Sequence, residues 1–229
     1  MYGKFLVEGD KLVRELLESN FKVDAIYKVQ SAKFVVPGKT TEIVEVTEAE
    51  LQKISTHETP NKVVAVASIP IQHSTSTVQP SDKGLVVVCD NLSDPGNAGT
   101  IIRTAEWFGV SSVVFSGNSV DIYNPKVVSA AKGSLFRVSC LYADLKQLLS
   151  DNKDKKVYGT FMEGDNIYKT ALTENAFVVI GNEANGISEE LLPLMDAKIS
   201  VPSFGKAESL NAGIAAAIVL SEFARRKSF

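Results

Sequence analysis

Three polar loops, each directly after an apolar run, hold most of the residues whose types could do chemistry. The first is DNLSDPGNAGTIIRTAEWFG (90–109), which follows the apolar run 85–89. The second, GNEANGIS, follows 178–180, and the third, SFGKAESLN, follows 199–202. Proteins of the α/β class bind ligands in the crevice beyond the carboxyl ends of their strands. We therefore expect the three loops to form one composite site.

The first loop contains an arginine with two possible roles. Asp94-Pro95-Gly96 predicts a turn, and Asn97 is expected to cap a helix over 97–108. Arg103 should point away from the apolar stripe of that helix. It could form a solvated ion pair with Glu106 at i+3. Alternatively, its planar fork could clamp phosphate or ribose oxygens in a ligand crevice.

The second loop contains two glycines and one acid. Gly181 to Gly186 superficially resembles the phosphate loop G-x-x-x-x-G-K-[ST], but Ile187 stands at the lysine position. Hydrolysis of ATP or GTP is therefore disfavoured, as is a dinucleotide, because no G-x-G-x-x-G follows the first strand of the larger unit. The two glycines would let the backbone approach a small ligand closely. Glu183 is either a solvent-exposed loop acid or part of the site.

The third loop leads through Ser209-Leu210-Asn211 into the almost wholly apolar stretch 212–220. A helix that is apolar on all sides must be buried on most of them. Asn211 at its start then needs hydrogen-bond partners, which a ligand or a second subunit could provide. The cations Arg225-Arg226-Lys227 at its end are explained by ordinary helix-terminus electrostatics.

Composition is that of an ordinary globular protein. The 229 residues are 45% hydrophobic and 22% charged, enough for one large domain or two small ones. A net charge of −3 and a pI near 5.5 argue against nucleic-acid binding by bulk electrostatics, although they allow a local basic face. The sequence has no apolar run of the ~18–20 residues that cross a bilayer, and we do not expect MYGKFLVEGDK to be a signal peptide, because it reaches an acidic residue early. We expect a cytoplasmic protein.

Cysteines and histidines offer no metal or nucleophile chemistry. Cys89 and Cys140 lie in apolar runs and are expected to be buried small hydrophobes rather than a disulfide or metal ligands. His57 and His73 lie in loop-like sequence without partners at metal-ligand spacing. The sequence predicts no metal site and no catalytic histidine.

The elements that must position these residues form two α/β units. A Pro- and Ser/Thr-rich stretch marks a linker at 71–83, between a small unit at 1–70 and a larger one at 84–229. The small unit should contain helices over 8–19 and 48–55 and strands over 23–29, 41–46 and 62–68. The larger unit should contain strands over 85–89, 111–116, 135–141, 156–161, 176–181 and 197–201, and helices over 97–108, 124–132, 144–151, 186–194 and 208–227. This alternation predicts a mostly parallel sheet with helices on both faces.

Residues 84–229 resemble the SpoU group of the SPOUT superfamily of RNA ribose 2′-O-methyltransferases. The resemblance rests on three motifs in order: DNLSDPGNAGTIIRTAEWFG, VVIGNEANGIS and ISVPSFGKAESLNAGIAAAIVL. Residues 1–70, through FLVEGDKLVREL and TPNKVVAVAS, resemble more loosely the ribosomal-protein-like RNA-binding domain that often precedes such enzymes. Asn61-Lys62 stands where that domain commonly has Gln-Gly.

The resemblance implies a deep trefoil knot in the C-terminal domain, S-adenosylmethionine as methyl donor, and a homodimer formed through the knotted domain. Cofactor contacts would fall on Gly181, Val201 and Leu210. The family's functional positions would fall on Asn97, Arg103, Glu183, Ser209 and Asn211.

The implied reaction is an in-line attack of a ribose 2′-hydroxyl of ribosomal or transfer RNA on the sulfonium methyl group. A guanidinium with a pKa above ~12 is a poor base. Arg103 is therefore expected to fix the nucleotide and stabilise the developing alkoxide. One alternative is a non-catalytic RNA-binding or ribosome-associated protein that kept the fold. A more distant one is a phosphate-ester hydrolase, which the lack of candidate metal ligands disfavours.

Overall fold

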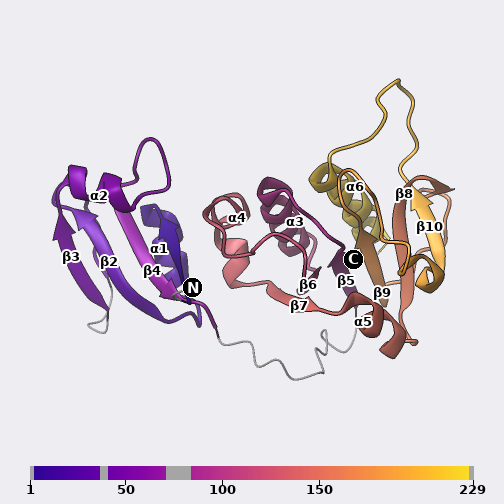
Figure 1. Ribbon diagram of the computed structural model, residues 1–229, viewed down its shortest axis with the longest axis horizontal. Coiled ribbons are helices and arrows are strands. Elements are labelled where there is room, and N and C mark those ends of the chain that lie inside the picture. The colour runs from indigo at the N-terminus through magenta and orange to yellow at the C-terminus, as the bar shows by residue number, and fades with distance from the viewer. Residues whose placement is uncertain (1–2, 37–40, 71–83, 227–229) are drawn as a thin grey trace.

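The protein is described by a computed structural model that covers residues 3–36, 41–70 and 84–226 (Figure 1). These residues form two α/β units, as the sequence predicts. The expected linker at 71–83, His73 within it, and Lys227 lie outside the described residues. None of the helices in the described ranges combines the length and apolar character that a membrane span requires.

The N-terminal unit is a four-stranded sheet with two helices. Its elements are β1 (Lys4–Glu8), α1 (Asp10–Leu17), β2 (Val23–Val29), β3 (Glu42–Val46), α2 (Glu48–Ile54) and β4 (Val63–Ser68), and the strand order is β1-β4-β2-β3. A capping box between Thr47 and Glu50 begins α2. β1 is not among the elements predicted from the sequence, and the first helix begins at Asp10 rather than at the predicted Glu8. The strand buries Phe5 and Val7 in alternation and ends at Gly9, whose φ of 102° breaks the chain direction before the helix.

The C-terminal unit is a six-stranded parallel sheet in the order β10-β8-β9-β5-β6-β7. Its strands are β5 (Leu85–Cys89), β6 (Ser112–Ser116), β7 (Ser139–Ala143), β8 (Lys156–Asn166), β9 (Ala176–Ile180) and β10 (Ala197–Ser200). Its α-helices are α3 (Pro95–Trp107), α4 (Pro125–Ala131), α5 (Leu145–Asp151) and α6 (Ala212–Arg225), with 3-10 helices η1 (Lys132–Phe136) and η2 (Leu192–Leu194). The central strands β5 and β9 are wholly buried and end together, with Cys89 paired to Ile180.

Helices cover both faces of this sheet, as the alternation of elements predicts. Val87 and Cys89 of β5 point to a core shared with α3, α4 and α6, whereas Val86 and Val88 point to a second core with α5. The fully apolar sequence of β5 is explained by burial on both faces. In Figure 1 the loop that joins β10 to α6 projects from the top of the C-terminal unit, above α6 and β10.

Two predicted elements differ from the structure. The helix expected over 186–194 is wrong: the chain forms turns and then the short η2, because Pro193 lacks an amide proton and the Ser188 amide donates to a distant carboxylate. The strand expected over 135–141 begins only at Ser139, since η1 occupies the preceding residues.

Two predicted helix starts differ as well. Asp94, not Asn97, caps α3, because its carboxylate accepts the Asn97 amide proton at 2.7 Å. The last helix begins at Ala212 rather than at 208, with Asn211 as its cap. Both corrections concern residues of the expected site.

The two units contact each other through aromatic rings and one arginine. Phe5 of β1 lies 4.8 Å from Tyr123, measured between ring centroids, and Phe21 lies 5.6 Å from Phe136. Arg137 donates to Glu15 of α1 at 2.9 Å and also to Glu106 of α3. Hydrogen bonds from Arg137 hold the pKa of Glu106 below its usual value. The ion pair considered between Arg103 and Glu106 is therefore wrong.

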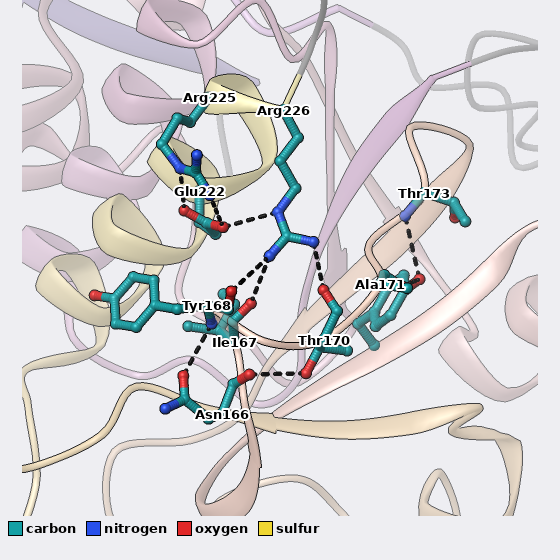
Figure 2. Close-up of polar contacts among 10 residues, drawn as sticks. Asn166, Ile167, Tyr168, Thr170, Ala171, Thr173, Glu222, Arg225 and Arg226 are labelled. Atoms are coloured by element: carbon teal, nitrogen blue, oxygen red, sulfur yellow. Dashed lines mark hydrogen bonds and ion pairs between the residues drawn. The ribbon is translucent and has the colours of Figure 1, made fainter.

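The C-terminal end of α6 is held by a buried carboxylate (Figure 2). Glu222 is 4% exposed and accepts hydrogen bonds from Arg225 and Arg226. Arg226 also donates to the carbonyls of Ile167, Tyr168 and Thr170, in the turn after β8. Hydrogen bonds from the two arginines lower the pKa of Glu222 to about 2. Arg226 therefore anchors α6 to the turn after β8, a role beyond the helix-terminus electrostatics expected from sequence, whereas Arg225 bonds, within the described residues, only to Glu222 of the same helix.

Candidate functional site

Two polar residues at the end of β5 connect the first and second motif loops. The Asp90 carboxylate, 3% exposed, accepts the Ser188 amide proton at 2.7 Å. Asn91 adopts φ 50° and accepts a hydrogen bond from the Asn182 side chain at 2.7 Å on its carbonyl. Sequence reasoning did not single out Asp90 or Asn91. The available signal was a carboxylate directly after a wholly apolar central strand, where it needs a partner.

Glu183 extends from the second loop to the first. Its carboxylate accepts hydrogen bonds from the Asn97 amide group at 2.9 Å and the Ser93 hydroxyl at 3.1 Å. Burial on its own raises the pKa of Glu183, but the hydrogen bonds from Asn97 and Ser93 outweigh it and lower the pKa. Glu183 is exposed on one side, yet its charge is fixed in place against the start of α3.

Asn97 is the residue that joins all three loops. Its Nδ2 donates to Glu183, and its Oδ1 accepts from Nδ2 of Asn211 at 2.7 Å. Asn211 in turn accepts the Ile214 amide proton at 3.2 Å and so caps α6. The partners that Asn211 was expected to need from a ligand or second subunit are thus supplied within the chain. Asn97 is 6% exposed, and both polar atoms of its amide are used.

The glycine loop is closed on itself. Asn182 and Gly186 exchange two backbone hydrogen bonds, each 2.9 Å long. A Cβ atom on Gly181 would lie 2.3 Å from the carbonyl carbon of Gly186, so no other residue fits there without moving the backbone. Gly186 has φ 70°, which also favours glycine. The two glycines therefore set the shape of the loop, and Gly181 begins it directly after β9.

The third loop leaves polar backbone and apolar side chains available. Between Pro202 and Leu210, the hydrogen bonds among the described residues are those between Ser203 and Gly205. Phe204 is 97% exposed and Leu210 48%, Ser209 is exposed, and Val201 is partly buried. Free backbone groups beside exposed apolar side chains suit a ligand with an aromatic base and ring nitrogens, such as an adenosyl group.

Arg103 lies apart from this hydrogen-bonded cluster. It follows Asn97 by six positions on α3, which places it roughly 9 Å along the helix and about 120° around it. It lines a cavity of about 930 Å³ between the two units, which none of the other predicted site residues lines. With respect to the residues that the structure describes, Arg103 makes no hydrogen bond or ion pair.

The cysteines are thiols outside any disulfide, as expected from the sequence. Cys89 is buried and Cys140 partly so. Burial raises the pKa of Cys89 well above its ordinary value and that of Cys140 to about 12, so both stay protonated thiols. Among the described residues, no group of His, Cys, Asp and Glu is placed so that it could hold a metal ion.

Comparison with known proteins gives matches over both units. Residues 84–221 match the SpoU rRNA Methylase family, and residues 1–65 match the MRM3-like substrate binding domain. The 23S rRNA (guanosine(2553)-2′-O)-methyltransferase RlmP of Bacillus subtilis is 32% identical over 94% of this chain and 86% of its own. The 23S rRNA (uridine(2479)-2′-O)-methyltransferase of Streptomyces viridochromogenes is 28% identical over 98% of this chain and 84% of its own.

Solved structures agree. A putative RNA methyltransferase of the TrmH family from Porphyromonas gingivalis has a TM-score of 0.85 and 35% identity, covering 98% of this chain and 91% of that one. The SpoU methyltransferase AviRb from Streptomyces viridochromogenes, in complex with AdoMet, also has a TM-score of 0.85, with 27% identity and coverage of 98% and 90%.

The parallel sheet with its three joined loops and these matches define the class, an S-adenosylmethionine-dependent RNA methyltransferase. The chain belongs to the SpoU rRNA methylase family, and it is an RNA ribose 2′-O-methyltransferase. The resemblance drawn from the three motifs is thereby confirmed, as is the cofactor expected from it.

Proposed function

We propose that the chain methylates a ribose 2′-hydroxyl in large-subunit ribosomal RNA. Two relatives that match this chain over more than four fifths of their own length carry names that place their reaction on 23S rRNA. The observation that carries the proposal is the hydrogen-bonded series Asn211–Asn97–Glu183, which joins the three motif loops into one site.

Gly181, Val201 and Leu210 would hold S-adenosylmethionine, which when bound supplies a methyl group activated on a sulfonium. Gly181 begins the closed loop, and Leu210 is exposed beside backbone groups that have no partner among the residues the structure describes. The fixed carboxylate of Glu183 would favour positive charge on this side of the site. Asn211 would hold the third loop against α3 through Asn97, and Ser209, which is exposed, would help to position the ribose.

Arg103 would position the nucleotide and stabilise charge on its 2′-oxygen. A ribose hydroxyl is a weak nucleophile until it is polarised or deprotonated. A guanidinium keeps its proton at any physiological pH and offers a planar fork for phosphate and ribose oxygens. Most of the acceleration would come from holding the hydroxyl in line with the methyl group.

The active form would be a homodimer formed through the C-terminal unit, working in the cytoplasm. Support comes from an exposed apolar side of α6: Ile214 is 53% exposed, and Ala217 and Ile218 line a cavity of about 670 Å³ with Phe108 and Tyr168. Family membership also implies a deep trefoil knot in the C-terminal unit.

The test is transfer of labelled methyl groups to total RNA, followed by mapping of alkali-resistant linkages. We expect resistance at one position of large-subunit RNA, because a 2′-O-methyl group blocks alkaline cleavage. Label found only on base atoms would contradict the ribose assignment. Calorimetry that finds no binding of S-adenosylmethionine would favour the non-catalytic RNA-binding alternative instead.

A further inference from the structure

Trp107 is a large aromatic side chain left in solvent at the end of α3. It is 84% exposed and lines the cavity between the two units. It follows Arg103 by four positions, so the two side chains lie on the same face of the helix. Neighbouring Ala105 is fully buried and anchors the helix without help from Trp107. An exposed indole beside a cavity indicates a binding surface rather than a packing role.

The cavity also presents three cations that form no ion pair with a described residue. Lys11 of α1, Arg103 of α3 and Lys132 line it, and none of them forms an ion pair with any residue in the described ranges. These cations come from both units, so the cavity has positive charge on two walls.

Three of the four acids that line the same cavity have partners, and the fourth, Asp10, has none among the described residues. Glu15 and Glu106 both bind Arg137. The Glu8 carboxylate accepts hydrogen bonds from Ser55 at 2.6 Å and from Thr56. An anionic ligand would therefore meet free cations, with most of the nearby carboxylates engaged elsewhere.

We propose that Trp107 stacks on an unpaired base of the RNA substrate, with Lys11, Arg103 and Lys132 contacting the adjacent phosphates. This deepens the function proposed above and rests on it. An RNA duplex hides its base edges, whereas splayed, unpaired bases stack readily on aromatic side chains. Aromatic faces combined with cations are what single-stranded nucleic acids bind. The cavity of about 930 Å³ has room for a nucleotide. Trp107 would thus be a specificity-determining residue one helical turn from Arg103.

Fluorescence tests the contact directly, because Trp107 is the single tryptophan of the chain. The full-length protein is titrated with a single-stranded oligouridylate of about 12 nucleotides, within the usual site size for such binding. We expect saturable quenching of the indole emission. An RNA duplex of equal length, at the same salt concentration, should quench far less. Equal quenching by both, or none by either, would overturn the proposal.

Kinetics test the consequence with Trp107→Ala and Trp107→Phe. Loss of one stacked base should raise the apparent KM for protein-free ribosomal RNA about tenfold in the alanine variant. The phenylalanine variant should stay within about threefold of wild type, since it keeps an aromatic face. The KM for S-adenosylmethionine should not change. Met162→Ala is the matched control, because it removes another large exposed apolar side chain, 74% exposed, outside the cavity.

Two kinetic outcomes would overturn the proposal. One is an unchanged KM for RNA in Trp107→Ala. The other is a smaller dimer fraction of that variant in light scattering, which would assign Trp107 to a subunit interface. If the wild-type protein itself transfers no methyl group to ribose, the proposed function fails. The fluorescence titration then still decides whether Trp107 contacts single-stranded RNA.

Discussion

The side chains at the two ends of α3 differ in hydrogen bonding and in exposure. At its start, Asn97 is 6% exposed and both atoms of its amide bind residues of other loops, Glu183 and Asn211. At its end, Arg103 and Trp107 face a cavity, and Trp107 is 84% exposed. Groups that are bonded in advance hold a site in shape, whereas free groups remain available to a substrate. We infer that the Asn97 end of α3 shapes the cofactor loops and that the end with Arg103 and Trp107 binds RNA.

Replacement of Arg103 should have the largest effect. Arg103→Ala removes the charge expected to stabilise the reacting oxygen, and loss of one such group commonly slows a reaction about 100- to 1,000-fold. We expect methyl transfer to fall by at least that factor, while calorimetry shows S-adenosylmethionine affinity within about twofold of wild type. Arg103→Lys, which keeps the charge but loses the planar fork, should recover part of the rate. A normal rate in the alanine variant would remove Arg103 from the mechanism.

Replacement of Asn97 should produce the reverse pattern. Asn97→Ala leaves Glu183 and Asn211 without their shared partner, which should cost about 1–3 kcal/mol of unfolding free energy. Because the loops lose their connection, the affinity for S-adenosylmethionine should fall about tenfold, which corresponds to 1.4 kcal/mol. Asn185→Ala is the control, since Asn185 is exposed and bonds only within its own loop. Weakened RNA affinity with intact cofactor affinity would contradict the division between the two ends.

A substitution of Glu222 tests whether the stability of the fold can fall while the cofactor site stays intact. The pKa of Glu222 is about 2 in the folded protein, below its ordinary value of 4.5. Its contribution to the free energy of unfolding is therefore fully present above pH 4.5. That contribution is lost as the pH falls toward 2. Glu222→Gln should therefore lower the Tm by several degrees at pH 7, and its difference from wild type should shrink below pH 4.5. Differential scanning calorimetry across this range measures the effect. Cofactor affinity at pH 7 should stay unchanged. A loss of affinity would show that the bonds of Glu222 to Arg225 and Arg226 are coupled to the site.

Local sequence patterns predicted the parallel sheet and the convergence of Asn97, Glu183 and Asn211 well. Apolar runs of strand length followed by polar loops mark buried parallel strands, and their carboxyl ends must share one edge. The failures involve partners distant in sequence. Asp90 binds the Ser188 amide, 98 positions away, and so prevents the expected helix. Glu106 pairs with Arg137, 31 positions away, instead of Arg103.

The helix cap was also assigned to the wrong residue, and the error bears on the site. Asp94 and Asn97 are both good caps, and only the path of the turn decides between them. Because Asp94 caps the helix and accepts the backbone amide proton of Asn97, the side-chain amide of Asn97 can bond to the other two loops. The exposure of Trp107 could not be read from the sequence, since an aromatic residue at a helix end is as readily buried as exposed.

Replacement of Arg137 should have the smallest effect, and it should change only the binding of RNA at the end of α3 that holds Arg103 and Trp107. Arg137 joins Glu15 of the N-terminal unit to Glu106 of α3, and half of its side chain is exposed, so its loss should lower stability only slightly. The walls of the cavity that holds Arg103 and Trp107 would then be less firmly placed. We expect Arg137→Ala to raise the KM for RNA severalfold with unchanged S-adenosylmethionine affinity. Lys156→Ala, which breaks an ion pair with Asp196 away from the cavity, should leave both unchanged. If the two variants behave alike, contact between the units through Arg137 does not contribute to RNA binding, and the end of α3 that holds Arg103 and Trp107 works independently of the N-terminal unit.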